Sequence, residues 1–111
     1  DQDYIKPKNE TLEDIFNALK KFEPDVFGVM HSNIKVTHKV IEYLSNHWSK
    51  QIMAYPEIID YDYSKHKYNA LISPKKFAYR CKDWLQMGVN IIGGCCGTTP
   101  NHIEELIKII D

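Results

Sequence analysis

Gly93-Gly94-Cys95-Cys96-Gly97-Thr98-Thr99-Pro100 is the most informative segment of this sequence. It follows a short apolar segment, Val89 to Ile92, that has the length of a buried strand, and it precedes Ile103 to Ile110, where apolar residues repeat with helical spacing. Thr99 and Pro100 indicate a helix start, because a threonine hydroxyl can cap free amides and proline at the first helical position needs no amide partner. The two cysteines are therefore expected at the carboxyl end of a strand, just before a helix.

Cys95 and Cys96 are adjacent, and adjacent side chains of a regular strand point to opposite faces. The pair can reach one common target only where the backbone leaves strand geometry, which the flanking glycines permit. Two thiolates bound to a soft cation such as zinc are the first interpretation. A redox pair that forms a disulfide between neighbours, and a pair of plain buried thiols, are the alternatives that remain open.

At this point the residues show a resemblance to a known family. Gly-Gly-Cys-Cys-Gly-Thr-Thr-Pro-x-His-Ile, from Gly93 to Ile103, resembles the carboxyl-terminal signature of the zinc-dependent homocysteine S-methyltransferases. Ser73 to Ala78 resembles the family's Ser-Pro-Glu-Glu-Phe-Ala helix start, and Tyr55-Pro56 resembles its Tyr-Pro-Asn turn. Further upstream, Phe27 to His31 falls where the family has Val-Gly-x-Asn-Cys. The similarity covers most of the chain and weakens towards the amino end.

The resemblance implies a zinc ion held by three cysteines, two of which match Cys95 and Cys96. His31 stands where the third cysteine is expected, and Met30 replaces the neighbouring asparagine. Histidine is a common zinc ligand, so Cys95, Cys96 and His31 are the predicted ligands. For His31 the alternative is a strand-end histidine satisfied by hydrogen bonds. Two thiolates and a neutral imidazole would leave the zinc site uncharged, which is expected to lower the pKa of a bound thiol and weaken its thiolate as a nucleophile.

The reaction that the resemblance implies is methyl transfer to homocysteine. Zinc would stabilise the homocysteine thiolate, the thiolate would attack a methyl group carried by sulfur or nitrogen, and methionine would form. Gly28, Met30 and Glu57 are weaker candidates for substrate binding, since Glu57 replaces the asparagine of the family's turn. Family contacts to the amino acid and the methyl donor lie largely in an amino-terminal part that this chain lacks. The 111 residues alone are therefore not expected to complete a catalytic cycle.

The rest of the chain predicts alternating helices and strands. Helices are expected from Thr11 until Pro24, from about Thr37 to Trp48, and from Ser73 to Gly88, and strands at Val26–Met30, Gln51–Tyr55 and Val89–Ile92. Such alternation predicts an α/β fold with a parallel sheet. With the resemblance, the predicted fold is the carboxyl-terminal portion of a TIM-type (β/α) barrel, with about three parallel strands and flanking helices.

A complete barrel needs eight strands and roughly 250 residues. Residues 1–111 are therefore predicted to be a single partial-barrel domain, with 1–9 as a leader or linker and 56–72 as a long loop. Its open sheet edges and uncovered face predict that it is a fragment, a split subunit completed by another chain, or a homo-oligomer.

Composition excludes several classes of function. Fourteen basic and fifteen acidic residues give a formal charge of −1, and no basic cluster indicates a nucleic-acid partner. No apolar run approaches the ~20 residues that cross a membrane. Three cysteines, two of them adjacent, make a poor disulfide framework and favour a reducing compartment, with the cytoplasm as the expected location.

Zinc-dependent methyl transfer to homocysteine is the first functional prediction. A non-catalytic zinc-binding or assembly subunit that retains the Gly-Gly-Cys-Cys motif is the alternative, and a vicinal dithiol redox protein is the third. Cys81 is expected in the core, and His102 is expected to make local hydrogen bonds. The remaining histidines are expected on the solvated surface, namely His38, His47 and His66.

Overall fold

The computed structural model describes residues 11–59, 61–62, 64–68 and 71–110. The predicted leader or linker at 1–9 lies outside these residues. In chain order the elements are α1 (Leu12–Lys20), β1 (Val26–Asn33), α2 (Ile34–His47), β2 (Gln51–Glu57), β3 (Tyr61–Asp62), β4 (Lys67–Tyr68), α3 (Pro74–Gln86), β5 (Ile91–Ile92) and α4 (Pro100–Ile110).

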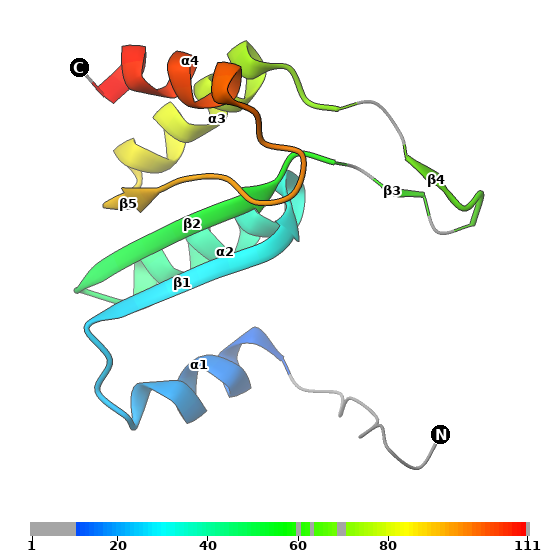
Figure 1. Ribbon diagram of the computed structural model, residues 1–111. Helices are drawn as coiled ribbons and strands as arrows, with labels where there is room; N and C mark the ends of the chain where they lie inside the picture. Colours follow the sequence, from blue (N-terminus) through cyan, green and yellow to red (C-terminus); the bar gives the residue numbers. More distant parts are fainter. Residues whose placement is uncertain (1–10, 60, 63, 69–70, 111) are drawn as a thin grey trace.

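Three strands form one parallel sheet in the order β1-β2-β5 (Figure 1). Helix α2 connects β1 to β2, and α3 lies between β2 and β5 along the chain. This arrangement confirms the predicted alternation and the three parallel strands with flanking helices. Because the strands run in the same direction, the loops that follow them lie at one edge of the sheet.

The two faces of the sheet differ in burial. Along β1, Phe27 and Val29 are buried, whereas Gly28 and Met30 are exposed. The buried face packs on the helices, whose fully covered side chains include Ile41, Phe77, Cys81 and Trp84. Parallel sheets are normally covered on both faces. The exposed face is therefore where further strands and side chains of a barrel are expected to pack.

The helix boundaries follow local capping chemistry. Thr11 and Asp14 form a reciprocal capping box at the start of α1, with distances of 3.1 and 3.0 Å. The Ser73 hydroxyl caps α3 ahead of Pro74. Gly88, with φ +107°, follows the end of α3 in the left-handed conformation that the sequence predicted.

Several predicted boundaries differ from the structure, and β5 covers only Ile91–Ile92 of the strand expected at Val89–Ile92. The break expected after Met30 lies inside β1, which continues to Asn33 through an irregularity in its pairing with β2. The side chain of Asn33 then caps α2 by accepting from the amide of Val36 at 2.8 Å. Helix α2 therefore begins three residues earlier than Thr37, because the cap and not the apolar period sets its start.

The segment predicted as a long loop contains regular structure. Strand β2 continues through the buried Pro56 to Glu57, and β3 and β4 then form a short antiparallel hairpin. In Figure 1 this hairpin projects away from the three-stranded sheet. No helix in the described part of the chain is long and apolar enough to span a lipid bilayer.

Cys81 lies in the core as predicted, and its burial raises the pKa of its thiol to about 12. We expect iodoacetamide at pH 8, with a chelator present, to modify Cys95 and Cys96 in the folded chain and Cys81 only after unfolding, because the thiolate is the reactive species. Mass spectrometry of peptides from folded and urea-treated samples measures this. Equal modification of all three thiols in the folded chain would contradict the buried position of Cys81.

Candidate metal centre

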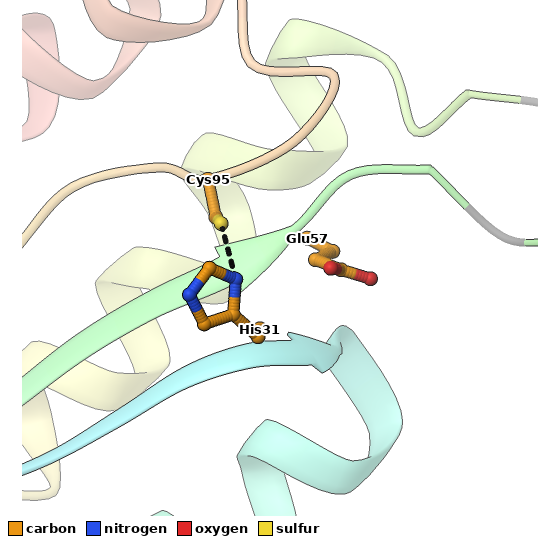
Figure 2. A group of neighbouring side chains, drawn as sticks. All are labelled: His31, Glu57 and Cys95. Atoms are coloured by element: carbon orange, nitrogen blue, oxygen red, sulfur yellow. Dashed lines mark hydrogen bonds between the residues drawn. The ribbon is translucent and has the colours of Figure 1, made fainter.

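Three side chains from separate elements meet at the carboxyl edge of the sheet (Figure 2). His31 comes from β1, Glu57 is the last residue of β2, and Cys95 follows β5. One nitrogen, oxygen or sulfur atom from each of the three lies within 4.8 Å of the others. Residues far apart in the sequence thus present three atoms of kinds that bind metals at one point.

Two separations measured from the sulfur of Cys95 are close to those of a tetrahedral zinc ion. Cys95 Sγ lies 3.2 Å from His31 Nδ1 and 4.0 Å from Cys96 Sγ. Zinc bonds of about 2.3 Å to sulfur and about 2.0 Å to nitrogen place two tetrahedral sulfur ligands about 3.8 Å apart, and a sulfur and a nitrogen about 3.5 Å apart. Both observed separations are within a few tenths of an ångström of these values. Cys96 is not part of the group formed by His31, Glu57 and Cys95, so its sulfur must move closer to His31 for all three predicted ligands to bind one ion.

The local backbone explains why His31 faces Cys95. His31 has φ +60°, in the left-handed region that non-glycine residues seldom adopt, and it lies where the β1–β2 register is irregular. A bulge of this kind redirects a side chain from the alternation of its strand. Figure 2 shows the imidazole directed at the cysteine sulfur. The unusual conformation thus brings a ring nitrogen to the site.

Main-chain hydrogen bonds hold the cysteine loop against the end of β2. The amide of Cys95 donates to the Pro56 carbonyl at 3.1 Å, and the Cys96 carbonyl accepts from the amide of Ile58 at 2.9 Å. The amide of Thr98 donates back to Cys95 at 3.2 Å, closing a turn. Cys95 is half-buried and Cys96 is exposed, so the two thiols leave this turn in different surroundings.

The glycines of the motif have different functions. A Cβ on Gly93 would overlap the ring of Tyr55, and one on Gly94 would overlap the side chain of Thr98. Close packing excludes a side chain at these two positions. Only Gly97, with φ +85°, needs the conformational freedom that the sequence suggested for the flanking glycines.

Neighbouring groups raise the pKa of the Cys96 thiol. The pKa of Cys96 is raised above its ordinary value, first by its hydrogen bond with Cys95 and the negative charge of that neighbour, then by partial desolvation and the Glu57 carboxylate. Removing a second proton next to an existing thiolate is unfavourable. A bound divalent cation would reverse this effect, because it attracts both thiolates.

The predicted site residues divide into two groups. Cys95 lies next to His31 and next to Cys96, and Glu57, which the sequence suggested for substrate binding, joins His31 and Cys95 in a group that does not include Cys96. The sequence places a carboxylate, Glu57, at the end of a predicted strand, but the distance from Glu57 to His31 and Cys95 could not be predicted from it. Gly28 and Met30 are exposed residues of β1 outside this group; Gly28 pairs with Met53 and Met30 with Tyr55 of β2.

Other candidates are placed by hydrogen bonds. His102 is buried and bonds to Thr99 and to the Ile72 carbonyl, so the prediction of hydrogen bonding is confirmed, but one partner is thirty residues away. The Thr99 hydroxyl contacts the His102 ring at 2.8 Å. His38 is half-buried and accepts a hydrogen bond from the Trp84 indole at 3.0 Å, so it is not a solvated surface residue.

Comparison with known proteins identifies the family of this chain. The family model described as homocysteine S-methyltransferase matches residues 2–110, nearly the whole chain. This chain belongs to the homocysteine S-methyltransferase family. It is 32% identical over 80 residues to homocysteine S-methyltransferase YbgG of Bacillus subtilis (strain 168), and 35% identical over 63 residues to homocysteine S-methyltransferase 2 of Arabidopsis thaliana.

The chain matches only a part of each relative. The two alignments cover 71% and 54% of this chain, but 25% of the Bacillus protein and 19% of the Arabidopsis protein. The three parallel strands therefore correspond to part of the (β/α) barrel of the homocysteine S-methyltransferase family, in agreement with the predicted fold class. The signature of the family lies on the loop that carries Cys95 and Cys96.

Proposed function

We propose that this chain is the zinc-binding part of a homocysteine S-methyltransferase, in which His31, Cys95 and Cys96 hold the metal. One observation carries the proposal: Cys95 Sγ lies within 4.0 Å of both His31 Nδ1 and Cys96 Sγ at the carboxyl edge of a parallel sheet. The family membership of the chain supplies the substrate class. Zinc bound there supplies a Lewis acid that favours the thiolate form of homocysteine at neutral pH.

The side chains of this chain set the charge and the access of the site. Cys95 and Cys96 contribute two negative charges once both are deprotonated, and His31 contributes a neutral donor. Glu57 adds a carboxylate within 4.8 Å of the ligand atoms of His31 and Cys95. It either completes the coordination or attracts the ammonium group of the amino-acid substrate. The exposed face that carries Gly28 and Met30 borders the site and leaves room for the substrate and the missing strands.

Methyl transfer is tested with the complete barrel restored. We expect methionine to form from homocysteine and a methyl donor, S-methylmethionine or betaine, when an amino-terminal barrel part from a family member is supplied, and not when either part is used alone. Mass spectrometry with a labelled donor methyl group measures the product. Cys95→Ser provides the control that retains the fold and loses a ligand.

A non-catalytic zinc-binding or assembly subunit is the second candidate. It is favoured by the exposed sheet face and by the small share of each relative that the chain spans. Full zinc loading without methionine formation, in a stable complex with the amino-terminal part, would select it over the methyltransferase. A completing chain or a second copy would cover that face in either case. A reducing compartment such as the cytoplasm suits both, because the two thiols must remain free.

His31 is tested as a metal ligand by two substitutions. His31→Ala is expected to weaken zinc binding by about 100-fold or more, since loss of an outer-shell partner alone costs 10–100-fold. His31→Cys restores a sulfur donor at this position and should bind zinc much more tightly than His31→Ala. Competition with a chromogenic chelator gives both affinities. His47→Ala is the matched control on an exposed histidine, and equal affinity of His31→Ala and His47→Ala would remove His31 from the site.

A further inference from the structure

A buried histidine outside the metal-ligand group connects three segments of the chain. His102 is only 3% exposed and lies in the first turn of α4. Its Nε2 lies 2.7 Å from the Ile72 carbonyl oxygen, and its Nδ1 lies 3.2 Å from the amide nitrogen of Thr99 and 2.8 Å from the Thr99 hydroxyl. The ring also packs edge-on against Phe77 of α3, with centroids 5.7 Å apart.

These partners fix the tautomer of the ring. A carbonyl oxygen can only accept, so Nε2 carries the hydrogen and donates to Ile72. An amide can only donate, so Nδ1 is bare and accepts from Thr99. The neutral ring with hydrogen on Nε2 is the single form that satisfies both contacts. No other side chain of this size offers a donor and an acceptor at opposite ends of a rigid ring.

The hydrogen bonds of His102 close a circuit that includes the cysteine loop. Ile72 donates its amide to the Ile58 carbonyl at 3.3 Å, and Ile58 donates its amide to the Cys96 carbonyl at 2.9 Å. The chain then runs from Cys96 through a turn to Thr99, which returns to His102. Ile58 is fully buried, so water does not compete for these bonds. The main chain of Cys96 is therefore held on both sides, by β2 and by α4.

We infer that His102 is a positioning residue for the metal-ligand loop, closing a circuit of hydrogen bonds that fixes the main chain between Cys96 and Thr99. The effect on metal binding rests on the proposed function, because a loop held in place keeps the thiols of Cys95 and Cys96 next to the proposed cation. Without the ring, the amide of Thr99 and the Ile72 carbonyl lose their shared partner, and the Thr99 carbonyl keeps its bonds to the amides of His102 and Ile103. Gly97, with φ +85°, lies between Cys96 and Thr99.

The test separates positioning from stability. His102→Ala, His102→Gln and Leu106→Ala are compared, because Leu106 has the same 3% exposure one turn further along α4 and its apolar side chain belongs to the hydrophobic core. The first measurement is Co²⁺ affinity, read from the sulfur-to-cobalt charge-transfer band, and the second is the thermal midpoint of each variant. We expect His102→Ala to lose about tenfold in Co²⁺ affinity, the lower end of the 10–100-fold seen when a group that bonds directly to a ligand is removed, because His102 acts through the main chain. His102→Gln should recover part of it through a retained amide donor, and Leu106→Ala should stay within twofold despite a lowered midpoint.

Two outcomes would overturn the inference: a His102→Ala variant that binds Co²⁺ within twofold of the parent chain, or a loss of Co²⁺ affinity in Leu106→Ala as large as that in His102→Ala.

A third measurement does not depend on zinc or cobalt. A monosubstituted trivalent arsenical bridges two neighbouring thiols, and its capture by Cys95 and Cys96 is expected to slow about tenfold in His102→Ala and to be unchanged in Leu106→Ala. If the parent chain binds no Co²⁺ or Zn²⁺, the proposed metal site fails. The arsenical rates then decide the positioning by themselves, with equal rates overturning it.

Discussion

Cys95→Ser and Cys96→Ser are each expected to lower zinc affinity by about 100- to 1000-fold, whereas Cys81→Ser leaves about one zinc bound per chain. Structural zinc sites with four ligands contribute about 10–16 kcal/mol, so one thiolate accounts for about 3 kcal/mol. Cys95 should show the larger loss, because its sulfur lies 3.2 Å from His31 Nδ1 and 4.0 Å from Cys96 Sγ and joins the other ligands. Competition against a chelator of known affinity, with metal content by mass spectrometry, gives the values.

Cys81→Ser is the matched control because it changes the same atom in a fully buried position of α3. Its effect should appear in the thermal midpoint and not in the metal content. Retention of full affinity by either Cys95→Ser or Cys96→Ser would mean that its sulfur does not bind the ion. Identification of a disulfide between Cys95 and Cys96 in protein purified under reducing conditions would instead support the redox interpretation.

Zinc affinity is expected to fall by about 100-fold for each unit that the pH decreases below the pKa values of the two thiols, because two protons must leave for each ion bound. Affinity falls with falling pH because protons compete with the metal for the thiolates. Cys95 raises the pKa of Cys96, and this extends the pH dependence to higher pH. Protons then compete with the metal up to a higher pH than at an isolated cysteine, and affinity continues to increase as the pH rises towards that value. In Cys96→Ser the slope should drop to about tenfold per pH unit. Affinities measured from pH 6 to pH 9 in one buffer series provide the slope.

Glu57→Gln tests the electrostatic part of the same prediction. The Glu57 carboxylate is one of the causes that raise the pKa of Cys96, so removing its charge should lower that pKa and move the pH dependence to lower pH. The amide keeps the shape of the side chain and an oxygen donor. A curve displaced to higher pH would contradict the sign. If affinity falls by the same factor at every pH, while the slope and the pH position of the curve stay the same, Glu57 is a direct ligand.

Several features could be predicted from local residues alone. Ser73-Pro74 and Gly88 mark the two ends of α3, because capping and the left-handed conformation depend on the residue in place. The alternation of strand and helix segments predicted the parallel sheet, because a helix that follows a strand leads the chain back to start a second, parallel strand beside the first. Because loops that follow parallel strands lie at one edge of the sheet, His31, Glu57 and Cys95 come together there. These are consequences of residue type and order.

Other features depended on how the chain packs. The start of α2 was misplaced because β1 continues through a bulge, and that bulge is set by its pairing with β2. His102 was expected to bond locally, yet its ring reaches Ile72, which only the packing of α4 beside α3 brings near. The distance of Glu57 from Cys95 likewise depends on the neighbouring strand ends.

The order of the elements, the family signature and the kinds of atom available to a metal follow from short stretches of residues and can be recognised without a structure. Which of those atoms come together depends on the packing of the chain. The left-handed conformation of His31 and the 3.2 Å approach of its ring to Cys95 arise where three strands end side by side, and no local pattern encodes that distance. Residues separated by 64 positions interact only because the parallel sheet returns them to the same edge.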